Sequence, residues 1–221
     1  MIINFDLLKK FKILSPDNRL HHIPTPIVAI TGGIATGKST LVDYIKQKGW
    51  GVISADILIK DVYQQTNTKN FLMHLAPGIM DSQGKIDFTK LRSLAFSDHQ
   101  IKESLEQFLY SQLPDVFWKF YKLLPAKPYF FYEVPLLFEK NLQCLVDLVV
   151  VLYTDPKVQL QRLSLRDNSS PEINEKIIQS QMPFENKKKL SHYIVDNNGS
   201  NEQLYSQVDI LLENIQHVFQ P

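Results

Sequence analysis

The segment from Gly32 to Ser39 reads G-G-I-A-T-G-K-S and has the spacing G-x-x-x-x-G-K-[ST]. In such a loop, successive backbone N–H groups point inward and form a concave anion site, assisted by the positive end of the helix that follows. We expect Gly32 and Gly37 to supply backbone conformations that a Cβ would obstruct. A glycine-rich turn that contains Lys by chance is the alternative, and the apolar strand and helix predicted on either side argue against it. The pattern therefore predicts a site for a nucleoside triphosphate.

The residues of this loop have separate expected tasks. Lys38 supplies a cation for the β and γ phosphates, and the Ser39 hydroxyl is placed to bind Mg²⁺. Glu133, at the end of a predicted strand, is a second candidate for the magnesium site; the alternative is that its carboxylate caps local backbone groups. ATP and Mg²⁺ are thus the expected cofactors, and the loop residues expected to contact the nucleotide are Gly33, Ala35, Thr36, Gly37, Lys38, Ser39 and Thr40.

A carboxylate and two arginines have the placement that small-molecule kinases need. Asp56 follows a short apolar strand, at the sheet edge where ligands of open α/β folds bind. Arg162 and Arg166 are four residues apart, so one helix face presents both guanidinium groups. They fit a lid that neutralises phosphate charge; the alternative is a solvated helix face on which they pair with Asp167.

Strands and helices alternate along the chain from Ile27, which predicts an α/β fold with a parallel sheet and helices on both faces. Short apolar runs, as expected for strands buried on both faces, predict strands at residues 27–30, 52–53, 129–134, 148–153 and 193–195. Helical spacing predicts helices at 38–48, 88–96, 98–124 with a break at Pro114, 158–166, 171–179 and 202–219. The first 26 residues are predicted to form an extension, a helix or tail packed on the outside.

Composition narrows the class of protein. There are 24 Lys and Arg against 23 Asp and Glu, so the net charge of +1 gives no overall attraction to nucleic acid or to an anionic membrane. The single cysteine, Cys144, cannot form an internal disulfide and fits a reducing compartment. The longest apolar stretch is far shorter than the roughly 20 residues of a membrane span. We therefore expect a cytoplasmic protein that needs no nucleic acid, membrane or obligate protein partner.

Phosphate loops of this kind serve kinases, GTPases and motor ATPases, and a GTPase would need further motifs. Its guanine-binding N-K-x-D element has no counterpart, because residues 186–189 read N-K-K-K. Residues 81–84, D-S-Q-G, match the D-x-x-G pattern of GTPases but do not follow an apolar strand. We interpret them as a turn.

The loop and five further segments resemble the dephospho-coenzyme A kinases, over a likeness that runs from about Ile27 to Leu212. The P-L-L-F-E segment and the Q-x-x-R-x-x-x-R-D segment are more discriminating than the phosphate loop. The segments are residues 31–40 (T-G-G-I-A-T-G-K-S-T), 52–56 (V-I-S-A-D), 84–96 (G-K-I-D to L-R and F), 134–139 (V-P-L-L-F-E), 159–167 (Q-L-Q-R to R-D) and 195–199 (V-D-N-N-G).

The resemblance implies a nucleoside-monophosphate-kinase-like fold: a three-layer αβα P-loop domain, residues 27–221, with a five-stranded parallel sheet. It also implies a helical acceptor-binding insertion at 57–126 and a lid at 155–190. The implied reaction transfers the ATP γ-phosphoryl group to the ribose 3′-hydroxyl of dephospho-CoA, the last step of coenzyme A synthesis. By the same likeness Asp56 is the general base and contacts the acceptor, Arg162 is the transition-state arginine, and Thr31 lines the acceptor site.

Three departures from the family pattern bear on these expectations. Ser54 replaces the first Asp of D-A-D, which removes one carboxylate from the site. Ala35 replaces a frequent loop glycine, and we expect a negative φ there. Tyr110-Ser111 stands where His-Pro is usual, which affects acceptor contacts. The competing hypotheses are a P-loop kinase for another nucleoside or small alcohol, and a nucleotide-dependent switch protein.

Overall fold

The computed structural model describes residues 13–81, 83–167 and 170–219. The chain divides into two compact units. One unit comprises Met1–Ser54 with Leu124–Pro221 and contains the sheet, and the other, Ala55–Leu123, is helical.

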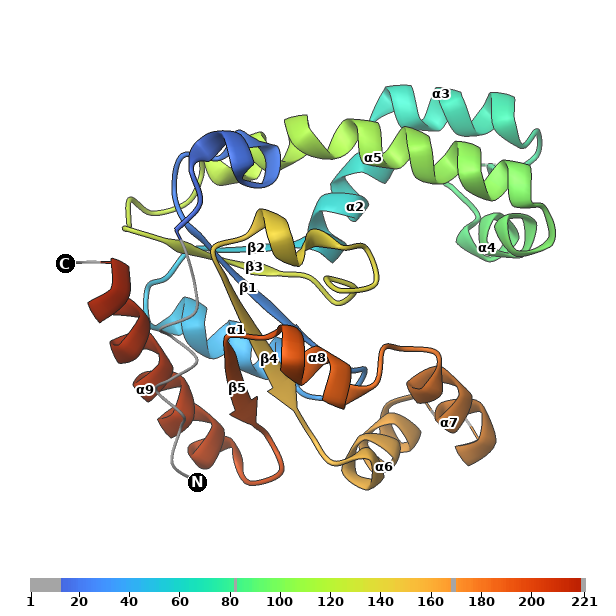
Figure 1. Ribbon diagram of the computed structural model, residues 1–221. Coiled ribbons are helices and arrows are strands. Elements are labelled where there is room, and N and C mark those ends of the chain that lie inside the picture. Colours follow the sequence, from blue (N-terminus) through green and yellow to red (C-terminus); the bar gives the residue numbers. More distant parts are fainter. Residues whose placement is uncertain (1–12, 82, 168–169, 220–221) are drawn as a thin grey trace. The chain divides into compact units, whose positions relative to one another are not determined.

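The first unit is built on a five-stranded parallel sheet with the order β2-β3-β1-β4-β5 (Figure 1). All five predicted strands are present, with ends within two residues of those expected, so the predicted α/β class and parallel sheet are confirmed. Their bounds are β1 Ile27–Gly32, β2 Val52–Ser54, β3 Phe130–Glu133, β4 Leu148–Tyr153 and β5 Tyr193–Asp196. Because the strands are parallel, their carboxyl ends share one edge, and β1 reaches that edge between β3 and β4.

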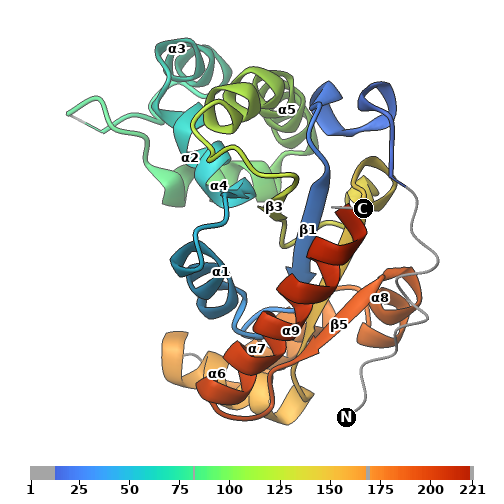
Figure 2. The same cartoon turned by 90° about the vertical axis from the view of Figure 1, so that its left-hand side faces the viewer.

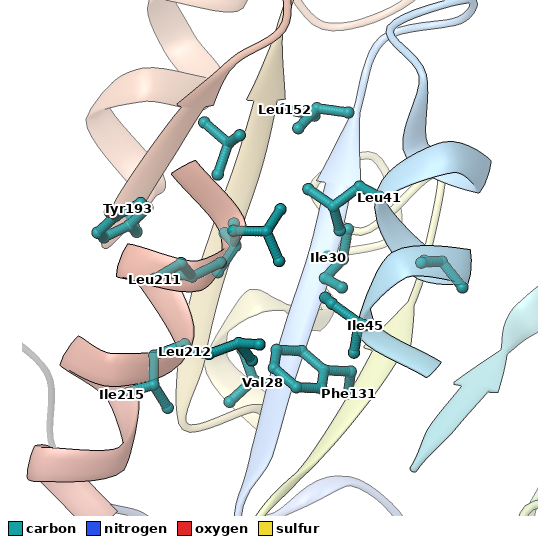
Figure 3. Close-up of a cluster of buried hydrophobic side chains, with 14 of the residues drawn as sticks. Val28, Ile30, Leu41, Ile45, Phe131, Leu152, Tyr193, Leu211, Leu212 and Ile215 are labelled. Atoms are coloured by element: carbon teal, nitrogen blue, oxygen red, sulfur yellow. The ribbon is translucent and has the colours of Figure 1, made fainter. Parts of the chain in front are cut away.

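Helices α1 (Lys38–Gln47) and α9 (Asn201–Phe219) cover one face of this sheet (Figures 1 and 2). Alternate strand residues point to the same face, so Val28 and Ile30 of β1 meet these helices. Figure 3 shows Leu41 and Ile45 of α1, with residues of α9, closing over them. Each such buried side chain contributes about 1.5–3 kcal/mol of hydrophobic stabilisation. This core fixes β1 against α1, and the phosphate loop lies between those two elements.

The opposite face of β4 is covered by α8 (Phe184–Leu190), which follows α6 (Pro156–Asp167) and α7 (Pro171–Gln179). The ring of Phe184 lies 4.1 Å from that of Tyr153. Helix α8 was not predicted, because residues 185–189 form a charged segment without an apolar pattern of helical spacing. Its middle residue, Lys187, is only 2% exposed.

Residues 13–26 contribute to the interior of the first unit, so the expected outer helix or tail is wrong for this described part. Two short 3₁₀ turns, Pro16–Asn18 and Leu20–His22, frame Arg19. Arg19 is 3% exposed and its Nε donates to Oδ2 of buried Asp147 at 2.7 Å. The same Oδ2 accepts the N–H of Ile27, so the ion pair secures the start of β1. Residues 1–12 lie outside the described part.

The helical unit consists of α2 (Ala55–Gln64), α3 (Thr66–Leu75), α4 (Phe88–Ser97) and α5 (His99–Tyr121). Phe71 of α3 stacks on Phe108 of α5 with ring centres 4.0 Å apart. Helix α5 runs through Pro114, so the predicted break there is wrong. Pro114 removes one internal hydrogen bond, and the packing of α5 on its neighbours offsets that loss.

The predicted turn at Asp81 is confirmed, because Asp81 Oδ1 accepts the N–H groups of Gln83 and Lys85. Among the helices of the described residues, none has the length and apolar character to cross a bilayer.

Candidate active site

The phosphate loop occupies residues 33–37, between the end of β1 and the start of α1. Gly37 has a φ of 90°, and a Cβ there would collide with the side-chain amide of Asn197. A Cβ on Gly32 would lie 2.7 Å from the carbonyl oxygen of Leu152. The expectation that both positions need glycine is confirmed, because neighbouring strand ends approach the loop closely.

Ala35 has a φ of 56°, which contradicts the negative φ expected from its side chain. The left-handed conformation costs a non-glycine residue roughly 1–2 kcal/mol. The loop also closes on itself through buried Thr36, whose Oγ1 donates to the Gly33 carbonyl at 2.8 Å. This loop thus keeps its glycine-like shape without the glycine.

Lys38 folds back over the loop. Its Nζ donates to the carbonyl oxygens of Gly32, at 3.0 Å, and Gly33, at 2.8 Å. Ser39 and Thr40 follow in the first turn of α1, whose N–H groups have no partner within the helix. An ammonium group and a helix N-terminus therefore meet at one loop, which is the arrangement that binds a polyphosphate.

Two residues that sequence analysis gave no role hold the loop from behind. Buried Asn197 donates from Nδ2 to the Thr36 carbonyl at 2.7 Å. Thr154 Oγ1 lies 3.2 Å from the same carbonyl oxygen and 3.3 Å from that of Asn197. Both residues directly follow a strand of the parallel sheet, β4 or β5, and that position is the signal by which they could have been found.

Arg162 lies beside the loop, as expected for a phosphate-neutralising arginine. Its Nη2 donates to the Asn197 carbonyl at 3.0 Å, and its Nη1 would be 3.9 Å from a Cβ placed on Gly37. Arg166 is in a different state: it is exposed and forms two hydrogen bonds with Asp167, at 2.6 and 2.8 Å. Its hydrogen bonds lower the pKa of the Asp167 carboxyl. Only Arg162 of the two stands at the loop in this structure.

Glu133 and Thr31 lie at the ends of adjacent strands. Glu133 pairs with Ile30 of β1 and with Ser54 of β2. Ser54, which stands where the family pattern has Asp, therefore lies next to the carboxylate of Glu133 in the sheet. Within residues 13–81, 83–167 and 170–219, no hydrogen bond or ion pair engages the Glu133 carboxylate, so the cap considered for it is not formed there. Buried Thr31 donates from Oγ1 to the carbonyl of Pro135 at 3.3 Å.

Asp56 belongs to the helical unit, as the second residue of α2. Its side chain is exposed, and α2 begins directly after β2. An acidic residue in the first turn is favoured by the helix dipole. The carboxylate is therefore available to a ligand that reaches this turn.

Comparison with known proteins gives a consistent result. The sequence model of the family described as "Dephospho-CoA kinase" matches residues 26–203. A dephospho-CoA kinase of Fusobacterium nucleatum is 33% identical over 86% of this chain and 98% of that protein. A solved structure from Thermus thermophilus has a TM-score of 0.77 and 28% identity, covering 86% of this chain and 98% of that one. The solved dephospho-CoA kinase of Campylobacter jejuni has a TM-score of 0.63 and 26% identity, covering 86% and 96%.

Proposed function

The chain belongs to the dephospho-CoA kinase family, and we propose that it transfers the γ-phosphoryl group of ATP to the ribose 3′-hydroxyl of dephospho-CoA, yielding coenzyme A and ADP. The observation that carries the proposal is that Arg162, from α6, lies against the loop that also holds Lys38. Two cations at one phosphate loop suit phosphoryl transfer, because its catalysis is mainly positioning and charge neutralisation.

ATP is bound, in this proposal, by the loop residues Gly33 and Ala35 to Thr40. The Lys38 ammonium exchanges its two loop carbonyls for oxygens of the β and γ phosphates. The N–H groups of the first turn of α1 face the same phosphates, and the helix dipole favours their negative charge. The loop needs little rearrangement, because Asn197 and Thr154 already hold its far side.

The oxygen atoms of Ser39 and Glu133 fit a magnesium site. Mg²⁺ prefers hard oxygen ligands and in kinases is held by one or two protein oxygens together with phosphates and water. The Glu133 carboxylate ends β3 without a partner in the described part of the chain, which suits a ligand that contacts the ion or its waters. The bound ion would neutralise charge on the β and γ phosphates.

The acceptor is activated, in this proposal, by Asp56. A new bond forms between the ribose 3′-oxygen and the γ phosphorus while the bond from that phosphorus to the β–γ bridging oxygen breaks. The hydroxyl proton passes to the Asp56 carboxylate, and ADP leaves with the electron pair of the broken bond. Thr31 is proposed to line this site, and the helical insertion, residues 57–126, to hold the rest of dephospho-CoA.

The lid, proposed for residues 155–190, supplies Arg162 to the transferred group and excludes water. Arg166 can assist only after it leaves Asp167, so we give it the smaller role. The reaction needs no nucleic acid, membrane or protein partner, and a reducing, ATP-rich cytoplasm is its proposed location.

The test incubates the protein with ATP, Mg²⁺ and one acceptor at a time: dephospho-CoA, adenosine, other nucleosides and small alcohols. We expect ADP and a product about 80 mass units heavier, the mass of one added phosphoryl group, with dephospho-CoA at a kcat/KM at least about 10²-fold above the other acceptors. A product with another acceptor alone would indicate a different kinase. Binding of ATP without any phosphorylated product would indicate a switch protein.

A further inference from the structure

The linker between α7 and α8, residues 180–183, contacts the phosphate loop through one side chain. Gln181 Oε1 accepts a hydrogen bond from the backbone N–H of Ile34 at 2.8 Å. This bond joins residues that are 147 positions apart in sequence, so the fold and not the local chain creates it. The partner residue Ile34 lies near the beginning of the loop, immediately before the strained residue Ala35.

Gln181 is itself held from behind. The N–H of the next residue, Met182, donates to Glu139 Oε1 at 3.1 Å. The same Oε1 lies 3.1 Å from Nζ of Lys187, which is 2% exposed. Within the described residues this ammonium is at ion-pair distance from Glu139, and the contact does not count as a hydrogen bond, so charge is the main attraction. Burial acts to raise the pKa of Glu139, and the N–H groups and Lys187 outweigh it, so the carboxyl stays ionised at neutral pH.

The hydrogen bond compensates for the conformation of the loop. Ala35 has a φ of 56°, a region that glycine enters freely and alanine does not. Gln181 fixes the Gly33–Ile34 peptide, which directly precedes the Ile34–Ala35 peptide whose nitrogen begins the left-handed residue. Without that bond, relaxation of Ala35 to a negative φ would rotate the neighbouring amides away from the phosphates.

We propose that Gln181 is a positioning residue of the phosphate loop: its hydrogen bond to Ile34 holds the left-handed turn at Ala35 that ATP binding needs. The residue acts through the loop backbone and touches no reacting atom. Of the proposed function, this inference uses only the binding of ATP at the loop, whatever the acceptor. An opposite hypothesis exists, in which the side chain occupies a phosphate site and must be displaced, and it predicts the opposite change in affinity.

The test is a double-mutant cycle on the full chain. ATP affinity is measured by calorimetric titration with a non-hydrolysable ATP analogue, on wild type, Gln181→Ala, Ala35→Gly and the double variant. We expect Gln181→Ala to weaken binding about three- to tenfold, the value of one hydrogen bond. In the Ala35→Gly background the same change should weaken it less than about twofold, because glycine holds the turn unaided.

Two further variants keep the result interpretable. Gln181→Met has the same length without the acceptor oxygen and replaces Gln181→Ala if that variant misfolds. Gln47→Ala, at the exposed last residue of α1, is the matched control and should bind the analogue as wild type does. In turnover assays, Gln181→Ala should raise KM for ATP, and its kcat should stay within about twofold of the wild-type value.

Equal losses in the wild-type and Ala35→Gly backgrounds would overturn the proposal, since the bond would then have no connection with the strained turn. Tighter binding by Gln181→Ala would also overturn it and favour displacement by phosphate. If dephospho-CoA proved not to be the acceptor, both outcomes of the titration could still be interpreted, because the titration contains no acceptor.

Discussion

The side chain of Asn197 and the carbonyl of Thr36 form a buried hydrogen bond of 2.7 Å between the end of β5 and the phosphate loop. The carbonyl of the same Asn197 accepts from Arg162 at 3.0 Å. One residue therefore fixes the loop with its side chain and Arg162 with its backbone. Because both contacts start from a strand end, the rigid sheet sets the distance between the loop and Arg162.

Replacement of Asn197 by Ala should damage the loop. It leaves the buried Thr36 carbonyl without this donor, which costs about 1–3 kcal/mol of unfolding free energy, and it frees Gly37 from its close neighbour. We expect KM for ATP to rise about tenfold, within the range of one lost buried hydrogen bond. Urea denaturation and steady-state kinetics measure the two effects. Asn198→Ala is the control, since exposed Asn198 bonds to Asp155 outside the loop; equal effects of both variants would contradict the role of Asn197.

The two arginines of α6 should differ sharply. Arg162→Ala removes the guanidinium that lies against Gly37, and we expect kcat to fall by a factor of about 10³, as for a transition-state arginine. Arg166→Ala removes a group that is paired with Asp167 and exposed, and we expect a loss below about tenfold. Single-turnover measurement of the transfer step decides between them. A loss of only a few-fold for Arg162→Ala would reduce that residue to a structural contact.

Asp56→Asn tests the proposed base. The amide keeps the size of the side chain but takes up no proton, so kcat should fall by about 10²- to 10⁴-fold. Affinity for ATP should stay within about twofold, because the loop is unchanged. Product formation and analogue titration give both values. Asp61→Asn, on the same helix but paired with Lys119, is the control, and turnover by Asp56→Asn at the rate of this control would exclude Asp56 as the base.

The buried pair Arg19–Asp147 should contribute to stability and not to chemistry. Arg19→Leu leaves a buried carboxylate without its cation, which costs about 3–5 kcal/mol of unfolding free energy. Asp209→Asn breaks the ion pair between Asp209 and Lys48, whose side chains are 47% and 41% exposed, respectively. This change should cost less than about 1 kcal/mol of unfolding free energy. Denaturant unfolding compares the two variants. Similar losses for both would show that Asp147 is compensated by its backbone donors alone.

What the sequence could predict follows from the range of the interactions involved. The strand at Leu148–Tyr153 was predicted to the residue, because an apolar run between turn residues is a local signal. The place of Lys38 and Ser39 at the start of the helix after β1 was also predicted, from the spacing of the loop. Gln181 was not, because its partner lies 147 residues away. The conformation of Ala35 was predicted with the wrong sign, since the contact that supports it comes from the same distant linker.

Acid should destabilise the fold through His192. The ring Nδ1 of His192 accepts the N–H of Val149 in β4, which requires that nitrogen to be unprotonated. Burial lowers the pKa of His192 below its usual value, so the unfolded chain takes up the proton first as the pH falls. The contribution of His192 to the unfolding free energy should therefore be constant above about pH 7 and fall as the pH drops below about 6.5, where an unfolded histidine titrates. Burial likewise lowers the pKa of His21, to about 4, so His21 adds to the same loss between pH 6.5 and 4.

The matched variant is His192→Gln, whose side-chain oxygen can accept the Val149 N–H without titrating. Urea unfolding at pH 7.5 and pH 5.0 should show a smaller loss on acidification for this variant than for wild type, and His21→Gln should also reduce it. Because each unit of pKa shift is worth about 1.4 kcal/mol, the difference between wild type and variant is large enough for such measurements to detect. An identical pH dependence in wild type and His192→Gln would mean that this ring is equally easy to protonate in the folded and unfolded chains, and that the bond to β4 has no part in acid stability.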